Sequence, residues 1–571
     1  MYILGISCYY HDSAAAILKD GQLIAVAEEE RFSRVKHDNS FPEKSIQFCF
    51  DMAGITREEI TYVVFYEKPF LKFERTFLNS IDYAPKTLSF FTESMKKWFF
   101  EHLWIKSRIL GELKIPPGKL LFCEHHLSHA ASAFFCSPFD KSAVITIDGV
   151  GEWTTASWGK ANGNRIDIKQ EIRFPHSLGL LYSVFTSFVG FEVNEGEYKT
   201  MGLAPYGKPK YVEEIYKLLK LSEDGSFELK LDYFAYHYSL KKVYSKKFEE
   251  IFGKVNKKPD RVKTYYADIA ASIQQVLEER LIKIASYVQK KTGLENLCFA
   301  GGVALNSVAN WKIFKETEFK HIYIQPAAGD SGGALGAALW VYRTVLNKKN
   351  RFVLDNAYWG ASETNEQIEQ FLIKQNIRYK KPKDEKKLLD QVADKLSKGK
   401  VVGWLQNKFE WGPRALGNRS ILADPRKKKM KDLVNSKIKF REGFRPFAPS
   451  VNLEDAGSFF EISKAEKEFP FRFMLYVVDV KESKRSELEA VTHEDGTARP
   501  QFVDKNTNPR YHRLIKSFGQ KIGTPVILNT SFNLKGEPIV NTAEEAFDTF
   551  SRSGIDSLVL GDFIVEKERQ I

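Results

Sequence analysis

The sequence contains few cysteines, and none of them are paired at metal-binding spacing. Its five cysteines are scattered over 571 residues, and no CxxC pair occurs among them: Cys8, Cys49, Cys123, Cys136 and Cys298. This pattern excludes a disulfide framework and a thiolate zinc knuckle, and it indicates a reducing compartment.

Long apolar runs are also lacking. The longest candidate for a membrane span, residues 178–191, contains Ser and Thr and is shorter than the ~20 residues that a hydrocarbon core requires. The first residues, MYILGISCYYHD, are typical of a strand. They do not show the basic leader and apolar stretch of a secretion signal. We therefore expect a cytoplasmic protein with no membrane partner.

Apolar and aromatic residues are plentiful. Hydrophobic residues make up 43% of the chain and aromatic residues 13%, which excludes a chain kept unfolded by its charge. The length predicts more than one domain. The net charge of +12 is compatible with nucleic acid, a membrane surface or small anionic ligands.

Two similar hairpin patterns occur in the first part of the chain. Apolar runs at 14–18 and 23–27 flank Asp20-Gly21, a strong hairpin signal. Residues 143–158 repeat the order of strand, glycine-rich turn and strand. The pair suggests an internal duplication, although hairpins of this kind are common in unrelated proteins.

Helical patterns and further strands fill the remaining sequence. Apolar spacing predicts a long helix over 266–292 and a strand at 297–300 that runs into two glycines. The polar segment 345–350 predicts a boundary between domains at 1–350 and 351–571. Strands are expected in the second domain at 401–404, 474–478 and 525–528.

A histidine cluster follows the predicted strand 120–122. His125 and His129 are four residues apart, so on a helix both imidazoles lie on one face. Asp148 and Asp330, each between a strand and a glycine-rich turn, could complete a metal site. Two histidines with carboxylates suit iron(II) and related ions. The alternative is that the histidines only pack at a helix start.

Glycines also mark the turn after the strand 297–300. Gly301 and Gly302 would let the backbone approach a ligand, and the following helix would favour an anion at its N-terminus. A tight turn between strand and helix would require the same glycines, so both readings stay open.

A basic region near residue 425 is the most informative. Residues 408–445 hold twelve basic and four acidic side chains. The arginines stand among glycines, prolines and aromatics, and the geometry of guanidinium and ammonium groups fits a multiply phosphorylated ligand. The cationic candidates are Arg414, Arg419, Lys439, Arg441 and Arg445. The run 426–431 is interpreted as a solvated face. Downstream, residues 529–533 offer hydroxyls and amides, or form a turn.

Taken together, these segments resemble the O-carbamoyltransferase family that acts on nodulation factors and antibiotics. The resemblance covers essentially the whole chain and rests on motifs in family order: GISCYYHDSAA, EERFSRVKHD, EHHLSHAASAFF, TIDGVGEW, EGEYKTMGLAPYG, FAGGVALN, PAAGDSGGALG, WGPRALGNRSILADPR, DGTARPQ and NTSFN.

The resemblance implies an α/β fold with two domains. The first is a duplicated, ribonuclease H-like domain of the actin/Hsp70 superfamily, and the second is a YrdC-like α/β domain. In the second domain, carbamoyl phosphate and ATP with Mg²⁺ would give carbamoyl adenylate and pyrophosphate. At a metal in the first, a hydroxyl of a sugar or natural product would take the carbamoyl group.

The resemblance also implies site residues. The metal ligands fall on His125, His129, Asp148 and Asp330, with Fe²⁺ favoured. The activation chemistry falls on Lys439, Arg441, Arg414, Arg445, Arg499, Ser531 and Asn533. Carbamoyl adenylate at the transfer site is expected near His11 and Lys36, and the nucleotide-binding turn of the first domain at Gly301, Gly302 and Asn306.

Two other functions compete with this one. A tRNA threonylcarbamoyl-type enzyme shares both domains, but we expect no nucleic-acid partner because no aromatic and basic RNA platform is visible. A non-catalytic ATPase would fit the duplicated hairpins alone. The acceptor and the oligomeric state are left open, with a homodimer as one option.

Overall fold

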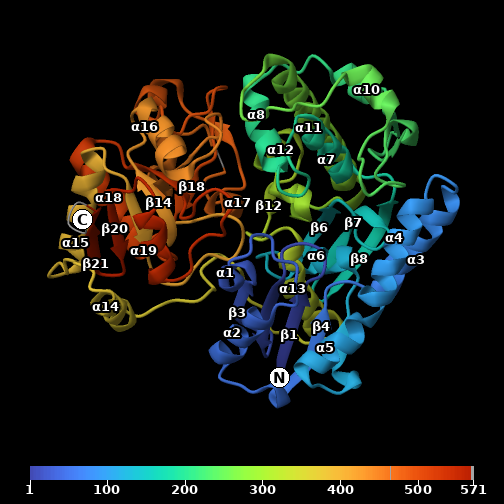
Figure 1. Cartoon of the computed structure of the whole chain (residues 1–571), viewed down its shortest axis with the longest axis horizontal. Helices are drawn as coiled ribbons and strands as arrows, with labels where there is room; N and C mark the ends of the chain where they lie inside the picture. Colours follow the sequence, from blue (N-terminus) through green and yellow to red (C-terminus); the bar gives the residue numbers. More distant parts are fainter. Residues whose placement is uncertain (463–464, 568–571) are drawn as a thin grey trace. The chain divides into compact units, whose positions relative to one another are not determined.

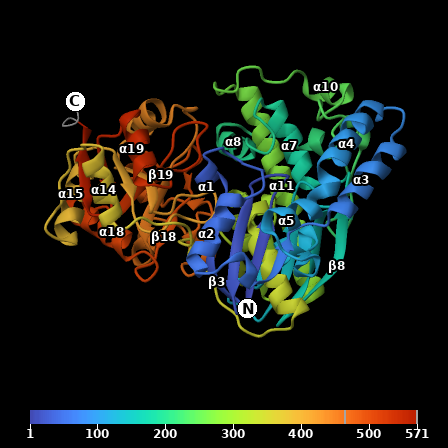
Figure 2. The ribbon, with the colours of Figure 1, turned by 60° about the horizontal axis from the view of Figure 1, so that its bottom comes forward.

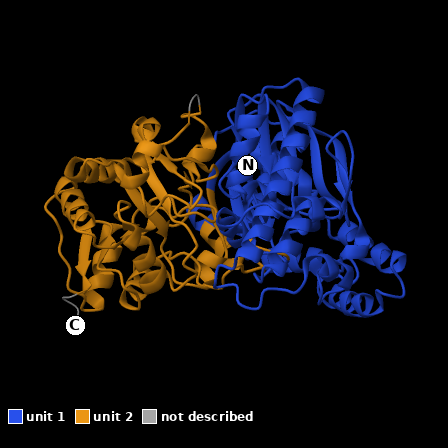
Figure 3. Ribbon diagram, turned by 90° about the horizontal axis from the view of Figure 1, so that it is seen from above, with its two compact units in different colours: residues 1–9, 14–24, 49–353 blue, residues 10–13, 25–48, 354–571 orange. Residues whose placement is uncertain are grey.

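A computed structural model of the chain describes residues 1–462 and 465–567. Helices and strands alternate along it (Figures 1 and 2), and it divides into two compact units (Figure 3). Unit 1 comprises residues 1–9, 14–24 and 49–353, and unit 2 comprises 10–13, 25–48 and 354–571. Two short N-terminal segments thus group with the C-terminal residues. The boundary placed near residue 350 stays a prediction.

The first sheet of unit 1 is built around its first strand. β1 pairs with β2 in antiparallel orientation and with β4 in parallel orientation, and β4 pairs in parallel with β5. The strand order is β3 (Gln22–Glu28), β2 (Ala14–Lys19), β1 (Tyr2–Ser7), β4 (Ile60–Phe65) and β5 (Leu120–Phe122).

The second sheet repeats this topology. β6 pairs with β7 in antiparallel orientation and with β11 in parallel orientation, and β11 pairs in parallel with β12. The order is β12 (His321–Tyr323), β11 (Asn296–Ala300), β6 (Lys141–Ile147), β7 (Thr154–Asn162) and β8 (Arg165–Arg173). The duplication suggested by the two hairpins is therefore confirmed, and the repeated strand order agrees with the duplicated α/β domain that the resemblance implies.

Two equivalent helices join the halves of unit 1. α6 (His125–Phe134) follows β5, α13 (Asp330–Trp340) follows β12, and the two helices pack together. A Cβ at Gly336 would lie 1.9 Å from the carbonyl oxygen of Ser128, so only glycine permits this close approach. The packing brings the two helix N-termini together.

Further helices complete unit 1. The predicted helix at 266–292 is confirmed as α11 (Thr264–Thr292). The remaining α-helices are α3 (Pro69–Asp82), α4 (Leu88–Phe100), α5 (Ile105–Leu113), α7 (Leu178–Phe188), α8 (Glu197–Leu203), α9 (Val212–Tyr216), α10 (Lys246–Phe252) and α12 (Ser307–Glu316). Within the described ranges, no helix is long and apolar enough to cross a membrane.

Unit 2 contains a mixed sheet of seven strands. Their order is β18 (Gln501–Val503), β15 (Ala448–Asn452), β19 (Val526–Ser531), β14 (Arg419–Ala423), β13 (Val402–Leu405), β20 (Ser557–Leu560) and β21 (Phe563–Glu566). β13 with β20 and β15 with β18 are parallel pairs. The strand predicted at 474–478 is wrong in extent, because only β16 (Val478–Asp479) forms and Met474 has a left-handed backbone.

The core of unit 2 lies between this sheet and two helices. α15 (Glu385–Ser397) and α18 (Pro509–Ile522) pack together and against the sheet. Buried Tyr511, Phe518 and Trp404 belong to the shared core. The other helices are α1 (Glu30–Ser33), α14 (Asn365–Lys374), α16 (Lys428–Leu433), α17 (Phe469–Arg472) and α19 (Ala543–Ser551), while α2 (Glu43–Ala53) spans the limit between the units.

Candidate metal centre and anion site

Four predicted metal ligands meet in unit 1. His125 and His129 lie on the first turns of α6, Asp148 follows β6 directly, and Asp330 is the first residue of α13. Asp148 thus ends a central strand, while the other three begin the two packed helices. All four ligand atoms lie within 4.8 Å of one another.

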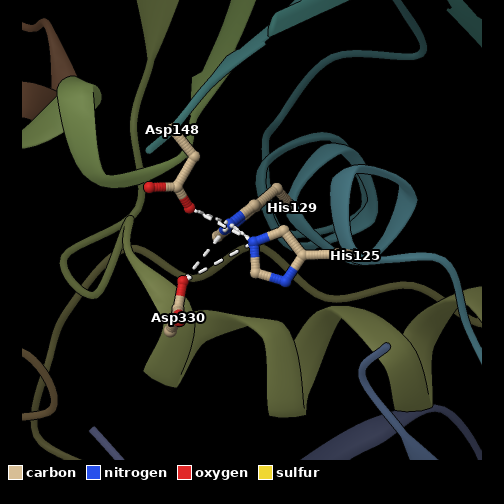
Figure 4. A group of neighbouring side chains, drawn as sticks. All are labelled: His125, His129, Asp148 and Asp330. Carbon is tan, nitrogen blue, oxygen red and sulfur yellow. Dashed lines mark hydrogen bonds and ion pairs between the residues drawn. The ribbon is translucent and has the colours of Figure 1, made fainter. Parts of the chain in front are cut away.

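The donor atoms converge on one point (Figure 4). Asp148 Oδ2 lies 3.2 Å from His125 Nε2 and 2.9 Å from His129 Nε2. Asp330 Oδ1 lies 3.6 and 3.7 Å from the same two nitrogens. Both imidazoles are buried. One carboxylate oxygen therefore faces two imidazole nitrogens, with a second carboxylate beside them.

The electrostatics of the centre fit a cation. Burial opposes charge, yet the carboxylates of Asp330 and Asp148 raise the pKa of His125 to about 9. Burial and the charge on His125 lower the pKa of His129. The two Nε2 atoms lie 3.0 Å apart, so only one of them can carry a proton that points at the other. A divalent ion would replace that proton and accept lone pairs from all four groups.

Glu152 supports the metal centre and was not predicted as a site residue. Its buried carboxylate accepts hydrogen bonds from the backbone N–H of His125 at 3.0 Å and of Lys68 at 2.7 Å. A carboxylate at a helix N-terminus stabilises the helix start, so Glu152 fixes the first ligand of α6. In the sequence, this role was indicated by the position of Glu152 in the motif TIDGVGEW.

The glycine turn after β11 stands next to this centre. Gly301 has a φ of 94°, and a Cβ there would lie 2.2 Å from the carbonyl oxygen of Ile147. A Cβ at Gly302 would lie 3.0 Å from Asp148 Oδ1. Asn306 caps α12 by accepting from the N–H of Ala309. These contacts account for Gly301, Gly302 and Asn306 without any ligand. Nucleotide binding at this turn therefore stays a prediction.

Lys439 forms the centre of a second site, in unit 2. It is buried, and its Nζ lies within hydrogen-bonding distance of four oxygens of Ser531 and Asn533, at 2.5 to 3.1 Å. Burial, followed by the charges of Arg441 and Arg445, lowers its pKa well below the usual range. The structure therefore brings three predicted residues into direct contact.

The predicted arginines gather around the same place. Burial and then the charges of Arg414, Arg441 and Arg445 lower the pKa of Arg499 well below its ordinary value. The guanidinium of Arg441 lies 4.7 Å from the Phe447 ring centroid and donates from Nε to Asn435. So many close cations stabilise an anion and repel one another without it.

Arg419 does not belong to this cluster, so its prediction as a phosphate ligand is wrong. Its guanidinium is fully buried and donates to backbone carbonyl groups of Gln406, Asn407 and Asn541. Burial lowers its pKa to about 10. Arg419 is thus a structural residue that satisfies carbonyl groups at one end of β14.

His11 and Lys36 also lie in unit 2. Asp12 joins His11 to an unpredicted partner, because its Oδ2 contacts His11 Nδ1 at 2.8 Å and its Oδ1 contacts His37 Nδ1 at 2.7 Å. The two oxygens contact different imidazoles, so Asp12 bridges the two histidines. The charge of Lys36 contributes to the lowered pKa of Lys439.

The backbone of this bridge is strained. Asp12 and His37 have φ values of 46° and 53°, a region that side chains disfavour and that is often found at functional sites. Both residues stand in the motifs YYHDSAA and VKHD, which were the available signals.

Comparison with known proteins places the whole chain among relatives. The family model described as Carbamoyltransferase N-terminus matches residues 2–339, and the one described as Carbamoyltransferase C-terminus matches residues 393–567. An uncharacterized protein of Synechocystis is 47% identical, with 100% of this chain and 97% of that protein covered.

Two relatives carry more informative names. Nodulation protein NolNO of Sinorhizobium fredii is 38% identical over 98% of this chain and 79% of its own length. A 3'-hydroxymethylcephem-O-carbamoyltransferase of Amycolatopsis lactamdurans is 34% identical over 52% and 53%. Among solved structures, HypF of T. kodakarensis is 13% identical with a TM-score of 0.32, over 61% of this chain and 48% of that one.

Proposed function

Because the chain belongs to the carbamoyltransferase family, we propose that it activates a carbamoyl group with ATP and transfers it to a hydroxyl group. Unit 2 would form carbamoyl adenylate from carbamoyl phosphate and ATP. Unit 1 would catalyse transfer to a sugar or natural-product acceptor, with release of AMP. The observation that carries the proposal is the buried Lys439 among arginines.

The first reaction explains the cations of unit 2. Carbamoyl phosphate and ATP are both multiply anionic, so bringing them together requires fixed positive charges. Water would first cleave carbamoyl phosphate to carbamate and phosphate. A carbamate oxygen would then attack the α-phosphorus of ATP, the bond between the α-phosphorus and the bridging oxygen would break, and pyrophosphate would leave. Each carbamoyl adenylate thus releases one phosphate and one pyrophosphate. We assign substrate phosphates to Lys439 and to Arg414, Arg441, Arg445 and Arg499.

The contacts of Lys439 suggest how its ammonium is held for this reaction. The four oxygens of Ser531 and Asn533 hold the ammonium in one position, so no reorganisation is needed when negative charge develops. For the later transfer step, we assign carbamoyl adenylate binding to His11 and Lys36, which the structure groups with unit 2.

The second reaction would use the centre of unit 1. His125, His129, Asp148 and Asp330 would hold a divalent ion, and two histidines with two carboxylates suit Fe²⁺. Such an ion supplies Lewis-acid polarisation of a carbonyl oxygen. Glu152 would keep His125 in place through the start of α6.

One experiment tests the activation step. The purified protein is incubated with ATP, Mg²⁺ and carbamoyl phosphate, and mass spectrometry is used to search for carbamoyl adenylate while phosphate and pyrophosphate are quantified. We expect equal amounts of both, and none of the pyrophosphate with α,β-methylene ATP. Pyrophosphate release that does not depend on carbamoyl phosphate would contradict the proposal. Added hydroxyl compounds that gain a carbamoyl mass identify the acceptor.

A further inference from the structure

One histidine of unit 2, His493, has a ring nitrogen to which no function has been assigned so far. Its Nδ1 lies 3.0 Å from Thr497 Oγ1. Its Nε2 is buried, and no described residue (1–462 and 465–567) forms a hydrogen bond with this atom. A buried polar atom without a partner costs free energy, so a ligand that supplies the missing partner gains a hydrogen bond.

A turn holds His493 beside the arginines of the anion site. The N–H of His493 donates to the carbonyl of Thr497 at 2.7 Å, and the N–H of Gly496 donates to the carbonyl of His493 at 3.1 Å. Strand β17 (Thr497–Ala498) follows, and Arg499 comes next, where the following proline favours an extended backbone. Side chains two residues apart in an extended segment share a face. Arg499 therefore lies on the same face as Thr497 and the imidazole that Thr497 contacts.

The hydroxyl of Thr497 decides which imidazole nitrogen carries the hydrogen. It donates to Asp495 Oδ1 at 2.7 Å, so its own hydrogen is not available to the ring. Nδ1 of His493 must then donate to Thr497 Oγ1, and Nε2 presents a lone pair. Burial lowers the pKa of His493 to about 4, the charges of Arg499 and Lys431 add to this effect, and that of Asp495 opposes it. The imidazole is therefore a neutral hydrogen-bond acceptor at neutral pH.

A neutral acceptor next to so many cations restricts the chemistry of its ligand. Lys439 and the arginines of the anion site only donate hydrogen bonds, and an ionised phosphate only accepts them. Neither can satisfy the lone pair on Nε2, which requires an N–H or O–H group. The amino group of carbamoyl phosphate is such a donor, and only one carbon and one oxygen separate it from the phosphorus. The adenine amino group of ATP lies farther from the phosphates, beyond the ribose.

We propose that Nε2 of His493 accepts a hydrogen bond from the amino group of carbamoyl phosphate and thereby selects this substrate over acyl phosphates. The inference rests on the function proposed for unit 2, and it adds the residue that recognises the carbamoyl group. An acyl phosphate carries a methyl group in place of the amino group, so it would leave the buried lone pair unsatisfied and bind more weakly.

Calorimetric binding of two stable phosphonates to the full chain, without ATP, tests this. Phosphonoacetamide keeps the amino group of carbamoyl phosphate and replaces its bridging oxygen by CH₂. In 2-oxopropylphosphonate a methyl group replaces the amino group. We expect the wild type to bind phosphonoacetamide at least about 10-fold more tightly, because the second compound loses a hydrogen bond to a buried acceptor.

Two histidine variants separate recognition from a structural effect. His493→Phe keeps a ring but removes the lone pair, so the preference for phosphonoacetamide should fall below about 3-fold, while binding of AMP, which has no carbamoyl group, should be unchanged. The matched control is His512→Phe, because His512 also belongs to unit 2 but its Nε2 already contacts Glu454 at 2.7 Å. This control should keep the preference of the wild type. Thermal unfolding checks that each variant is folded, and His493→Leu replaces His493→Phe if the latter does not fold.

Four results would overturn the inference. The wild type could bind neither phosphonate, or it could bind both equally. The preference could survive in His493→Phe, or His512→Phe could lose it to the same extent. A wild type that prefers phosphonoacetamide, but releases no pyrophosphate with ATP and carbamoyl phosphate, would contradict the proposed activation reaction and support the recognition role of His493.

Discussion

Replacing Lys439 by methionine tests the activation site most directly. Methionine retains most of the apolar stem but removes the ammonium that donates to Ser531 and Asn533. Removal of one fixed group that stabilises developing charge costs about 10²–10³ in kcat. We therefore expect pyrophosphate release with saturating ATP and carbamoyl phosphate to fall by at least about 100-fold.

Stability should change much less than activity. The substitution leaves oxygens of Ser531 and Asn533 without their donor, at a cost of roughly 1–3 kcal/mol. It also relieves the repulsion that Arg441 and Arg445 exert on the buried ammonium, which offsets part of that cost. We expect a loss of no more than about 2 kcal/mol in the free energy of unfolding.

The assay needs a matched lysine and an independent readout. Lys437, on the same helical segment as Lys439, is exposed, so Lys437→Met should release pyrophosphate at the wild-type rate. The metal content of both variants should equal that of the wild type, because the metal centre lies in unit 1. A Lys439→Met protein that is folded and releases pyrophosphate at the normal rate would refute the assignment.

Three further substitutions probe the metal centre and the stability of both units. Asp148→Asn should remove most bound metal in elemental analysis, whereas the exposed Asp167→Asn should retain it; equal metal contents would contradict the site. Gly301→Ala should lower the free energy of unfolding by at least about 2 kcal/mol, because its Cβ would meet a carbonyl oxygen. Gly118→Ala, with no atom near its Cβ, should change it by less than about 0.5 kcal/mol in urea titrations, and similar losses would disprove the clash. Burial lowers the pKa of His493 to about 4 in the folded protein, whereas a histidine of the unfolded chain has a pKa of about 6.5. As the pH falls, the unfolded chain therefore takes up a proton before the folded protein does. The free energy of unfolding should fall by roughly 2–3 kcal/mol as the pH is lowered from about 6.5 to about 4. If the stability of His493→Gln depended on pH as strongly as that of the wild type, protonation of His493 would not be the cause.

The sequence predicted those features that depend on local spacing. The i,i+4 pair of His125 and His129 lies on one helix face because a helix has 3.6 residues per turn. Asp148 was predicted where a strand ends, and the two hairpins indicated the duplicated sheets. In each case, the residues involved are close in the chain or repeat a known period.

Features that depend on distant segments could not be predicted in this way. The sequence does not distinguish the surroundings of Arg419 from those of Arg499. In the structure, the guanidinium of Arg419 donates to backbone carbonyl groups, whereas Arg499 lies close to other guanidinium groups. The bridge between His11 and His37 depends on two loops that meet at Asp12.

The division of the metal ligands between the two halves of unit 1 has a thermodynamic consequence. The first half supplies His125 and His129 through α6, and the second supplies Asp148 and Asp330 through β6 and α13. Neither half holds enough donors for a tight site. Binding of an ion and association of the halves would therefore be linked equilibria, so an ion held by all four residues would contribute its binding free energy to the cohesion of the duplicated fold.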